Sequence, residues 1–104
     1  MPNFMLTYLG TPKISSPEEK LSHMQKYQQW IIDLGDAALS PMNPLKNMSV
    51  VASDGSVSEG GETGMSGFTI VTAESMQAAL EIAQACPFLD VSGRLEVSEM
   101  IQVG

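Results

Sequence analysis

The sequence predicts a single α+β domain, in which an antiparallel sheet of four strands carries two helices on one face. Three observations predict it. Two segments repeat apolar residues at three- and four-residue spacings, which is typical of helices with one buried side. Four other segments are short and apolar, or alternate apolar with polar residues, as strands do. The order strand-helix-strand-strand-helix-strand then fits one core of the size that 104 residues can build.

The first strand and the first helix have clear local signals. Residues 3–9, NFMLTYL, form a short apolar run that ends before a glycine. Ser16 fits the cap of the following helix, with Pro17 at its first position and Glu19 three residues after the cap. Gly35 is well placed to end this helix. Its predicted buried stripe consists of Leu21, Met24, Tyr27, Ile31 and Leu34.

Two strands are expected in the middle of the chain. Pro41 and Pro44 keep residues 39–47, LSPMNPLKN, out of regular helix. Residues 48–53, MSVVAS, are the second predicted strand, with weak alternation, and residues 67–73, GFTIVTA, are the third.

The second helix and the last strand complete the chain. Ser75 caps a helix that runs to about Ala85, and Pro87 closes it. Residues 94–103, RLEVSEMIQV, alternate and form the last predicted strand. The predicted buried residues here are Met76, Ala79, Leu80 and Ala83 on the helix, and Leu95, Val97, Ile101 and Val103 on the strand.

This β-α-β-β-α-β order is that of the ferredoxin-like arrangement. One face of the sheet, beneath the helices, is expected to collect Phe4, Leu6, Tyr8, Phe68, Ile70, Leu95, Val97, Ile101 and Val103. The opposite face is expected to collect Met5, Thr7, Leu9, Thr69, Val71, Glu96, Ser98 and Met100. These residues are less polar than those of a face open to water, and more polar than those of a fully dry interface. This intermediate polarity favours a homodimer that encloses a partly polar cavity, and the alternative is a monomer with an amphipathic open face.

Charge and composition exclude several classes of protein. The net charge is −7, and residues 47–104 hold eight acids and the single base Arg94, which disfavours nucleic acid and anionic membranes. No apolar run is long enough to span a bilayer, and the first residues do not resemble a secretion signal. Cys86 is the only cysteine, so no internal disulfide forms. The sequence predicts a cytoplasmic protein.

The glycine-rich stretch of residues 54–67, DGSVSEGGETGMSG, raises the question of a ligand loop. A phosphate loop would lead into a helix, but this one leads into a predicted strand. Its acids, Asp54, Glu59 and Glu62, do not have calcium-loop spacing. Asp54 and Gly55 form a strong turn signal, so the stretch is mainly a connection between strands, and a role in closing over a ligand stays open.

Several segments form a recognisable pattern: SPEEKLSHMQKYQQWIIDLG, NPL, DGSVSEGG, SGFTIVTAESMQAALEIAQACP and GRLEVSEM. In this pattern the chain resembles the YCII-related, or DGPF-domain, family over nearly its whole length. Asp54 and Gly55 of the DGPF tetrapeptide are kept, but Ser56 and Val57 replace its Pro-Phe, as in a divergent branch. The resemblance implies a ferredoxin-like α+β barrel made by a homodimer. Most members have no known activity, some relatives use a His–Asp pair in a pocket, and the wider superfamily includes a dehydrochlorinase acting on a chlorinated hydroxyquinol.

His23 is the only histidine and the first candidate for catalysis, near where catalytic family members place theirs. An imidazole can take or give a proton near neutral pH, but His23 could equally be a surface residue half covered by Tyr27. Asp33 lies about three turns further along the same helix and cannot reach it. Asp54, or an acid from the other subunit, is the better candidate partner.

The candidate ligand-binding residues are Tyr8, Tyr27, Trp30 and Asn43. Tyr27 and Trp30 could line a pocket for a flat ligand, although such a pair is more often part of a core. Cys86 lies at a helix C-terminus, where the dipole disfavours a thiolate. No ligand spacing indicates a metal, and no motif indicates a cofactor.

Two functions therefore stay open. The first is a non-catalytic protein that binds a small molecule in a pocket at the dimer cavity. The second is a cofactor-independent lyase or isomerase, acting on a small and possibly phenolic substrate, with His23 as general acid/base. The sequence slightly favours binding, because it does not complete a catalytic pair.

Overall fold

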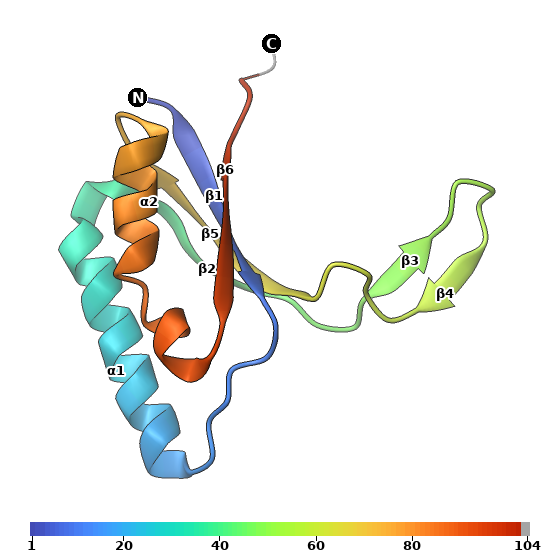
Figure 1. The fold of residues 1–104 in the computed structure, drawn as a ribbon, viewed down its shortest axis with the longest axis horizontal. Coiled ribbons are helices and arrows are strands. Elements are labelled where there is room, and N and C mark those ends of the chain that lie inside the picture. The colour runs from blue at the N-terminus through green and yellow to red at the C-terminus, as the bar shows by residue number, and fades with distance from the viewer. Residues whose placement is uncertain (103–104) are drawn as a thin grey trace.

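The computed structural model describes residues 1–102, and it confirms the α+β class and the antiparallel sheet of four strands with two helices. The arrangement is consistent with a ferredoxin-like fold. Both helices lie against the same face of the sheet (Figure 1). The elements are β1 (Asn3–Leu9), α1 (Pro17–Leu34), η1 (Gly35–Ala37), β2 (Ala38–Pro44), β3 (Ser49–Val51), β4 (Val57–Glu59), β5 (Met65–Thr72), α2 (Met76–Gln84), η2 (Pro87–Val91) and β6 (Arg94–Glu99).

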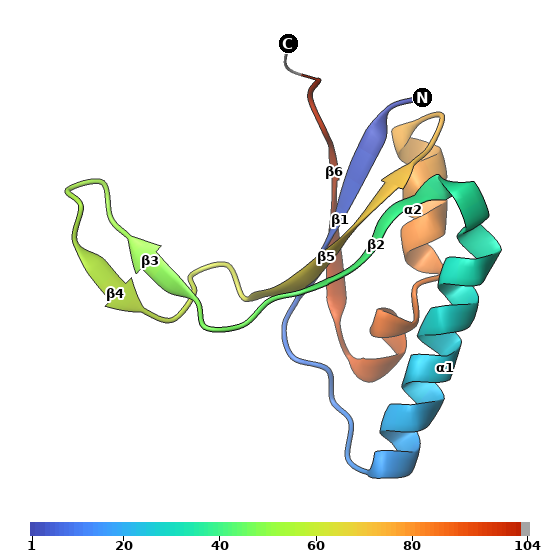
Figure 2. The same ribbon diagram turned by 180° about the vertical axis from the view of Figure 1, so that it is seen from behind.

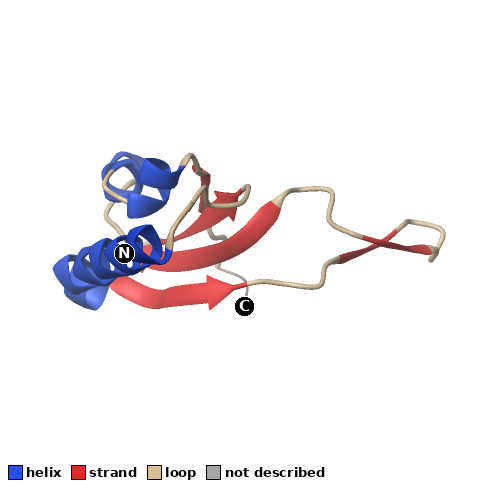
Figure 3. Cartoon of the chain, turned by 90° about the horizontal axis from the view of Figure 1, so that it is seen from below, coloured by secondary structure: helices blue, strands red, loops and turns tan. Residues whose placement is uncertain are grey.

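The main sheet has the strand order β2-β5-β1-β6, and every neighbouring pair is antiparallel. Strand β1 is central, and Leu6 pairs with Thr69 of β5 on one side and with Val97 of β6 on the other. Because residues that pair across strands point to the same face, these three side chains lie together beneath the helices. The other face of the sheet carries no helix (Figure 3).

Both helices begin where the local signals predict. The Ser16 hydroxyl accepts a hydrogen bond from the Glu19 N–H at 3.1 Å, and Pro17 is the first residue of α1. Gly35 ends α1 with φ +56°, a conformation that glycine adopts without strain. The Ser75 hydroxyl caps α2 by accepting from the Ala78 N–H at 3.2 Å.

The predicted buried stripes of the helices are only partly right. On α1 the buried residues are Tyr27 and Trp30, whereas Leu21 and Met24 are exposed because the first turns of α1 extend past the sheet (Figure 1). On α2, Ala79 and Ala83 are buried, but Met76 and Leu80 are partly exposed. The small alanines let α2 approach the sheet closely.

The predicted second strand, residues 48–53, forms as β3 (Ser49–Val51), but it is not part of the main sheet. The fourth strand of the main sheet is β2 (Ala38–Pro44), and residues 49–51 instead pair with β4 in a separate sheet of two strands. Proline lacks the N–H that a central strand needs, but an edge strand tolerates it. Strand β2 lies at the edge, and its pairing with β5 is interrupted between Ala38 and Ser40 and again between Ser40 and Asn43. Pro41 therefore fits into an irregular part of the strand.

The predicted faces of the third and last strands also need correction. Thr69 and Val71 of β5 are fully buried beneath the helices, because they pair with Leu6 and Phe4 of β1. Phe68 and Ile70 consequently lie on the open face. The segment GFTIVTA is apolar at both alternate sets of positions, so its pattern did not decide the face. Strand β6 ends at Glu99, Met100 and Ile101 follow it outside the sheet, and Val103 lies outside the described residues.

Residues 45–64 form a projecting hairpin, which we call the arm (Figure 2). Strands β3 and β4 pair from Ser49 and Glu59 to Val51 and Val57. The turn is closed by the Gly55 N–H donating to the Ala52 carbonyl at 2.8 Å. The radius of gyration is 15.1 Å, against about 13 Å for a compact domain of this length, because the arm extends away from the body. The glycine-rich stretch is thus a connection between strands, as predicted, and it contains β4.

No helix in the described part of the chain combines the length and the apolar character that a membrane span requires.

Candidate ligand pocket

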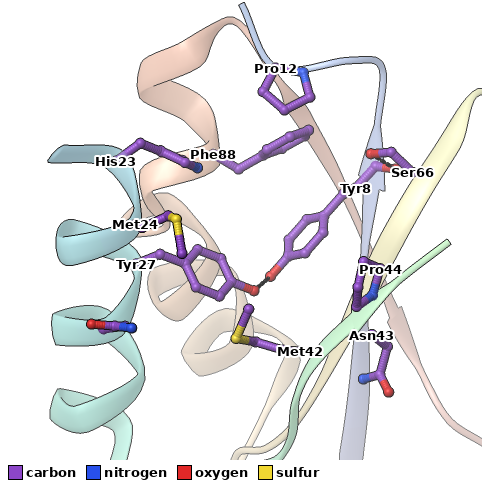
Figure 4. Close-up of a pocket in the computed structure, with 11 residues that line it drawn as sticks. Tyr8, Pro12, His23, Met24, Tyr27, Met42, Asn43, Pro44, Ser66 and Phe88 are labelled. Carbon is purple, nitrogen blue, oxygen red and sulfur yellow. Dashed lines mark hydrogen bonds between the residues drawn. The ribbon is translucent and has the colours of Figure 1, made fainter. Parts of the chain in front are cut away.

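A pocket of about 250 Å³ opens between α1 and the strands β1 and β2, on the helix-covered side of the sheet. Figure 4 shows its wall, which is mostly aromatic, methionine and proline side chains. None of the residues lining it is Lys, Arg, Asp or Glu. They are Tyr8, Pro12, His23, Met24, Tyr27, Gln28, Met42, Asn43, Pro44, Ser66 and Phe88.

The hydroxyls of Tyr8 and Tyr27 lie at the floor of this pocket, and both contact the hydroxyl of Thr69, which is fully buried and does not line the pocket. The Tyr8 hydroxyl is hydrogen-bonded to the Tyr27 hydroxyl (Figure 4). It is also hydrogen-bonded to Oγ1 of Thr69. Tyr27 and Thr69 are themselves 3.0 Å apart at their oxygens. Both donate to the carbonyl of Pro41, Tyr27 at 3.0 Å and Thr69 at 2.8 Å. The interrupted pairing of β2 frees this carbonyl from the ladder, so it serves as the acceptor that the buried hydroxyls need.

Burial keeps Tyr8, Tyr27 and the neighbouring Cys86 in their neutral forms. Desolvation raises the pKa of the Tyr8 phenol well above its ordinary value, and it raises the pKa of Tyr27 in the same direction. Burial likewise raises the pKa of the Cys86 thiol to about 11. At neutral pH the floor therefore presents neutral hydroxyls, and Cys86 is not a nucleophile.

His23 lies in the wall of the pocket, on the second turn of α1. It is half-buried, and its ring centroid is 6.3 Å from that of Tyr27. In Figure 4 its ring points toward Phe88 across the mouth of the pocket. A bound molecule would therefore contact His23 and Tyr27 on the side of α1 and Tyr8 on the side of the sheet.

The structure brings together four of the six predicted site residues, namely Tyr8, His23, Tyr27 and Asn43. The Asn43 amide nitrogen donates to the carbonyls of Ser40 and Phe68 and to the Ser40 hydroxyl, at 2.9–3.2 Å. Its amide therefore holds the irregular part of β2 in place, and this in turn positions the wall of the pocket.

The other two predicted residues lie elsewhere. Asp54 is exposed in the turn of the arm, where it accepts hydrogen bonds from the Ser56 N–H and hydroxyl, at 2.9 and 2.7 Å. Within one chain it does not pair with His23, because the arm points away from α1 (Figure 1). Trp30 is buried, and its indole Nε1 donates to the Ile82 carbonyl at 3.2 Å, so it joins α1 to α2.

Several residues of the pocket were missed in the sequence. Met42 and Pro44 belong to β2, which was not predicted as a strand because it contains two prolines. Phe88 belongs to the short helix η2 that follows α2. The sequence feature that relates to the position of Phe88 is Gly93. A Cβ atom at position 93 would lie 2.2 Å from a carbon of the Phe88 ring. Gly93 therefore leaves the space that the Phe88 ring fills.

A second hollow, of about 540 Å³, lies at the other end of the helices. Its wall includes three exposed acids, Asp33, Glu74 and Glu81. Over residues 1–102, however, no group of three or more His, Cys, Asp or Glu side chains is placed to hold a metal ion. The candidate site is therefore the first pocket.

Comparison with known proteins adds no further assignment: no protein-family model matches this chain, and no curated protein matches it.

Proposed function

We propose that this protein binds a small, neutral and largely apolar molecule in the pocket between α1 and the sheet. The observation that carries the proposal is the pocket itself, which combines apolar walls with the neutral hydroxyls of Tyr8 and Tyr27 at its floor, both hydrogen-bonded within the protein. Binding sites for small molecules typically combine these two features, because apolar walls supply affinity and a few polar groups fix orientation.

The size and the charge of the pocket define the ligand class. Its 250 Å³ lies just below the ~300–1,000 Å³ of common ligand pockets, so the ligand should be smaller than a typical drug molecule. A charged ligand would lose its hydration without gaining a permanently charged partner, since no Lys, Arg, Asp or Glu lines the wall and His23 is its only basic side chain. A polar group of the ligand could bond to the Tyr8 hydroxyl or to the side chains of Ser66 and Gln28.

We also propose that two copies associate through the open faces of their sheets and that the chain is a divergent member of the YCII-related family. The corrected register supports the association, because Phe68 and Ile70 now join Met5 and Leu9 on the open face, where Thr69 and Val71 were expected. This face is therefore more apolar than the sequence predicted. The ferredoxin-like arrangement fits a dimeric α+β barrel of that family. The cytoplasmic location stays a prediction.

A second candidate function is catalysis of a lyase or isomerase type with His23 as general acid/base. It is favoured by the position of His23 in the wall of the same pocket. A general base is commonly oriented by an acid. Because none of the residues lining the pocket is Asp or Glu, such an acid would have to come from the second copy. Binding without catalysis is therefore the primary proposal.

The test is a nuclear magnetic resonance screen with small neutral aromatic compounds and with their carboxylate analogues. We expect the neutral compounds to shift the resonances of Tyr8, His23 and Tyr27, and the carboxylates to shift them far less. Met24→Trp fills the mouth of the pocket and should abolish these shifts.

Leu21→Trp is the matched control, because Leu21 is also exposed on α1 but does not line the pocket. It should bind as the wild type does. If no neutral compound shifts the three resonances, or if the Met24→Trp protein binds equally well, the pocket is not the binding site.

A further inference from the structure

The arm, residues 45–64, is too small to keep its shape by itself. Its strands β3 and β4 have three residues each, and a hairpin of two strands is at best marginally stable in water. Val51 and Val57 lie directly opposite each other on it, with 67% and 68% of their surfaces exposed. The arm thus presents an apolar pair of side chains to water, although it has no core of its own.

The direction of the arm relates it to the open face of the sheet. In Figures 1 and 2 the helices lie on one side of the sheet and the arm extends on the opposite side. Figure 3, at right angles to these views, also shows the arm extending away from the helices. A second copy that packs on the open face would therefore lie on the same side as the arm.

The open face of the sheet is too small to form a stable interface without a further contact surface. Four strands spaced ~4.8 Å apart, each about six residues long, cover roughly 400 Å². Two copies would then bury about 800 Å² in total, which is below the ~1,200–2,000 Å² of stable interfaces. The arm consists of two antiparallel segments of one chain, each about ten residues long. One arm therefore presents a surface of roughly 300 Å² to the partner. Each arm covers an equal area of the partner, so with both arms the interface reaches about 2,000 Å², at the upper end of that range.

We propose that the arm of each copy packs on the second copy of this chain, with Val51 and Val57 against the partner. This proposal rests on the homodimer proposed above and adds the surface that makes it stable. The partner also supplies the contacts that keep the hairpin of β3 and β4 folded.

The test compares two substitutions at neighbouring positions of β4. Val57→Asp places a charge on the face of the hairpin that carries Val51, whereas Ser58→Asp places the same charge on the face that carries Val50. Both side chains are exposed in one chain, so neither change should affect the body. The fluorescence of Trp30, the only tryptophan, checks this, because its side chain is buried in the body.

Analytical ultracentrifugation over a range of concentrations gives the dissociation constant of the dimer. Removing a buried valine contact should weaken binding roughly tenfold. A symmetric dimer carries each substitution twice, so Val57→Asp should raise the dissociation constant by about 100-fold. Ser58→Asp should change it by less than about threefold.

The outcomes separate the two proposals. If the wild type is a dimer and both variants bind alike, the arm does not contact the partner, although the dimer stands. A wild type that stays monomeric at all concentrations overturns the dimer, and the arm proposal with it. Hydrogen exchange provides an independent check, since the amides of β3 and β4 should be protected at high protein concentration and exchange rapidly after dilution.

Discussion

The hydroxyls of Tyr8 and Tyr27 are hydrogen-bonded to each other beneath helix α1, although the two residues are 19 positions apart in the chain. This contact joins the central strand β1 to α1 at the floor of the pocket. Their rings meet edge to face, with centroids 6.2 Å apart. The chemistry of the pocket and the packing of α1 on the sheet therefore depend on the same two side chains.

The first prediction concerns the ionisation of the tyrosines. Tyr8 and Tyr27 are the only tyrosines, and burial raises the pKa of both. At pH ~10, where free tyrosine is half ionised, the folded protein should therefore show clearly less tyrosinate absorbance than the denatured protein. Ultraviolet titration measures this directly, with the protein in denaturant as the control. A native titration that follows the denatured one would contradict the buried positions of these hydroxyls.

The second prediction is a loss of stability at alkaline pH. The folded pKa values of Tyr8, Tyr27 and Cys86 are raised, so above about pH 9 the unfolded chain loses these protons before the folded protein does. Stability should thus be constant from neutral pH to about pH 9 and then fall. Each group removes up to about 1.4 kcal/mol per pH unit. Urea unfolding as a function of pH measures the slope.

Tyr8→Phe removes one of these groups and should make the alkaline slope of the free energy of unfolding smaller. An unchanged slope would show that Tyr8 ionises equally in the folded and unfolded protein.

The third prediction concerns the Pro41 carbonyl, which accepts from both Tyr27 and Thr69. Tyr27→Phe or Thr69→Val removes one donor and leaves the other, so each should cost about 0.5–1.5 kcal/mol. The double variant leaves the carbonyl without either hydroxyl and should cost more than the sum of the two. A thermodynamic cycle from urea unfolding measures this difference. Additive effects would mean that the two hydroxyls do not share the carbonyl.

The fourth prediction concerns Gly93. Gly93→Ala would place a methyl group against the Phe88 ring, and it should reduce the free energy of unfolding by about 1–3 kcal/mol. Since Phe88 lines the pocket, its displacement should also weaken the binding of neutral aromatic compounds.

Gly61→Ala is the control, because the closest atom to its new methyl group would be the flexible Sδ of Met48, at 3.0 Å. Thermal unfolding and the ligand screen of both variants compare the two sites. Equal stability of the two variants would show that the Phe88 ring adjusts without strain.

The sequence predicted those elements whose signals are local. Ser16, Pro17 and Glu19 mark the start of α1 by bonds within four residues, and the same holds for Ser75 in α2. Strand β2 was missed because Pro41 and Pro44 are compatible with a strand only at a sheet edge, and the edge is set by the whole topology. The face of β5 was missed because its segment is apolar at both alternate sets of positions, and the polar Thr69 is buried where it can donate to Pro41, a residue of another strand.

The candidate site follows the same rule. His23 and Tyr27 share a face of α1, so helical spacing placed them together. Trp30 is near the same face of α1, but it belongs to the core. Its indole Nε1 donates to the carbonyl of Ile82 in α2. Asp54 could not be placed from the sequence, because the direction of the arm depends on how β2 and β5 leave the sheet.

The prolines of β2 have one more consequence. Sheets can grow when an outer strand offers a continuous row of amide hydrogens to a neighbouring chain, and this growth leads to fibrils. Pro41 and Pro44 interrupt that row along one margin of the sheet, while Arg94, Glu96 and Glu99 place charges along the opposite margin. Both margins thus oppose strand addition, which protects a small, partly apolar domain from aggregation.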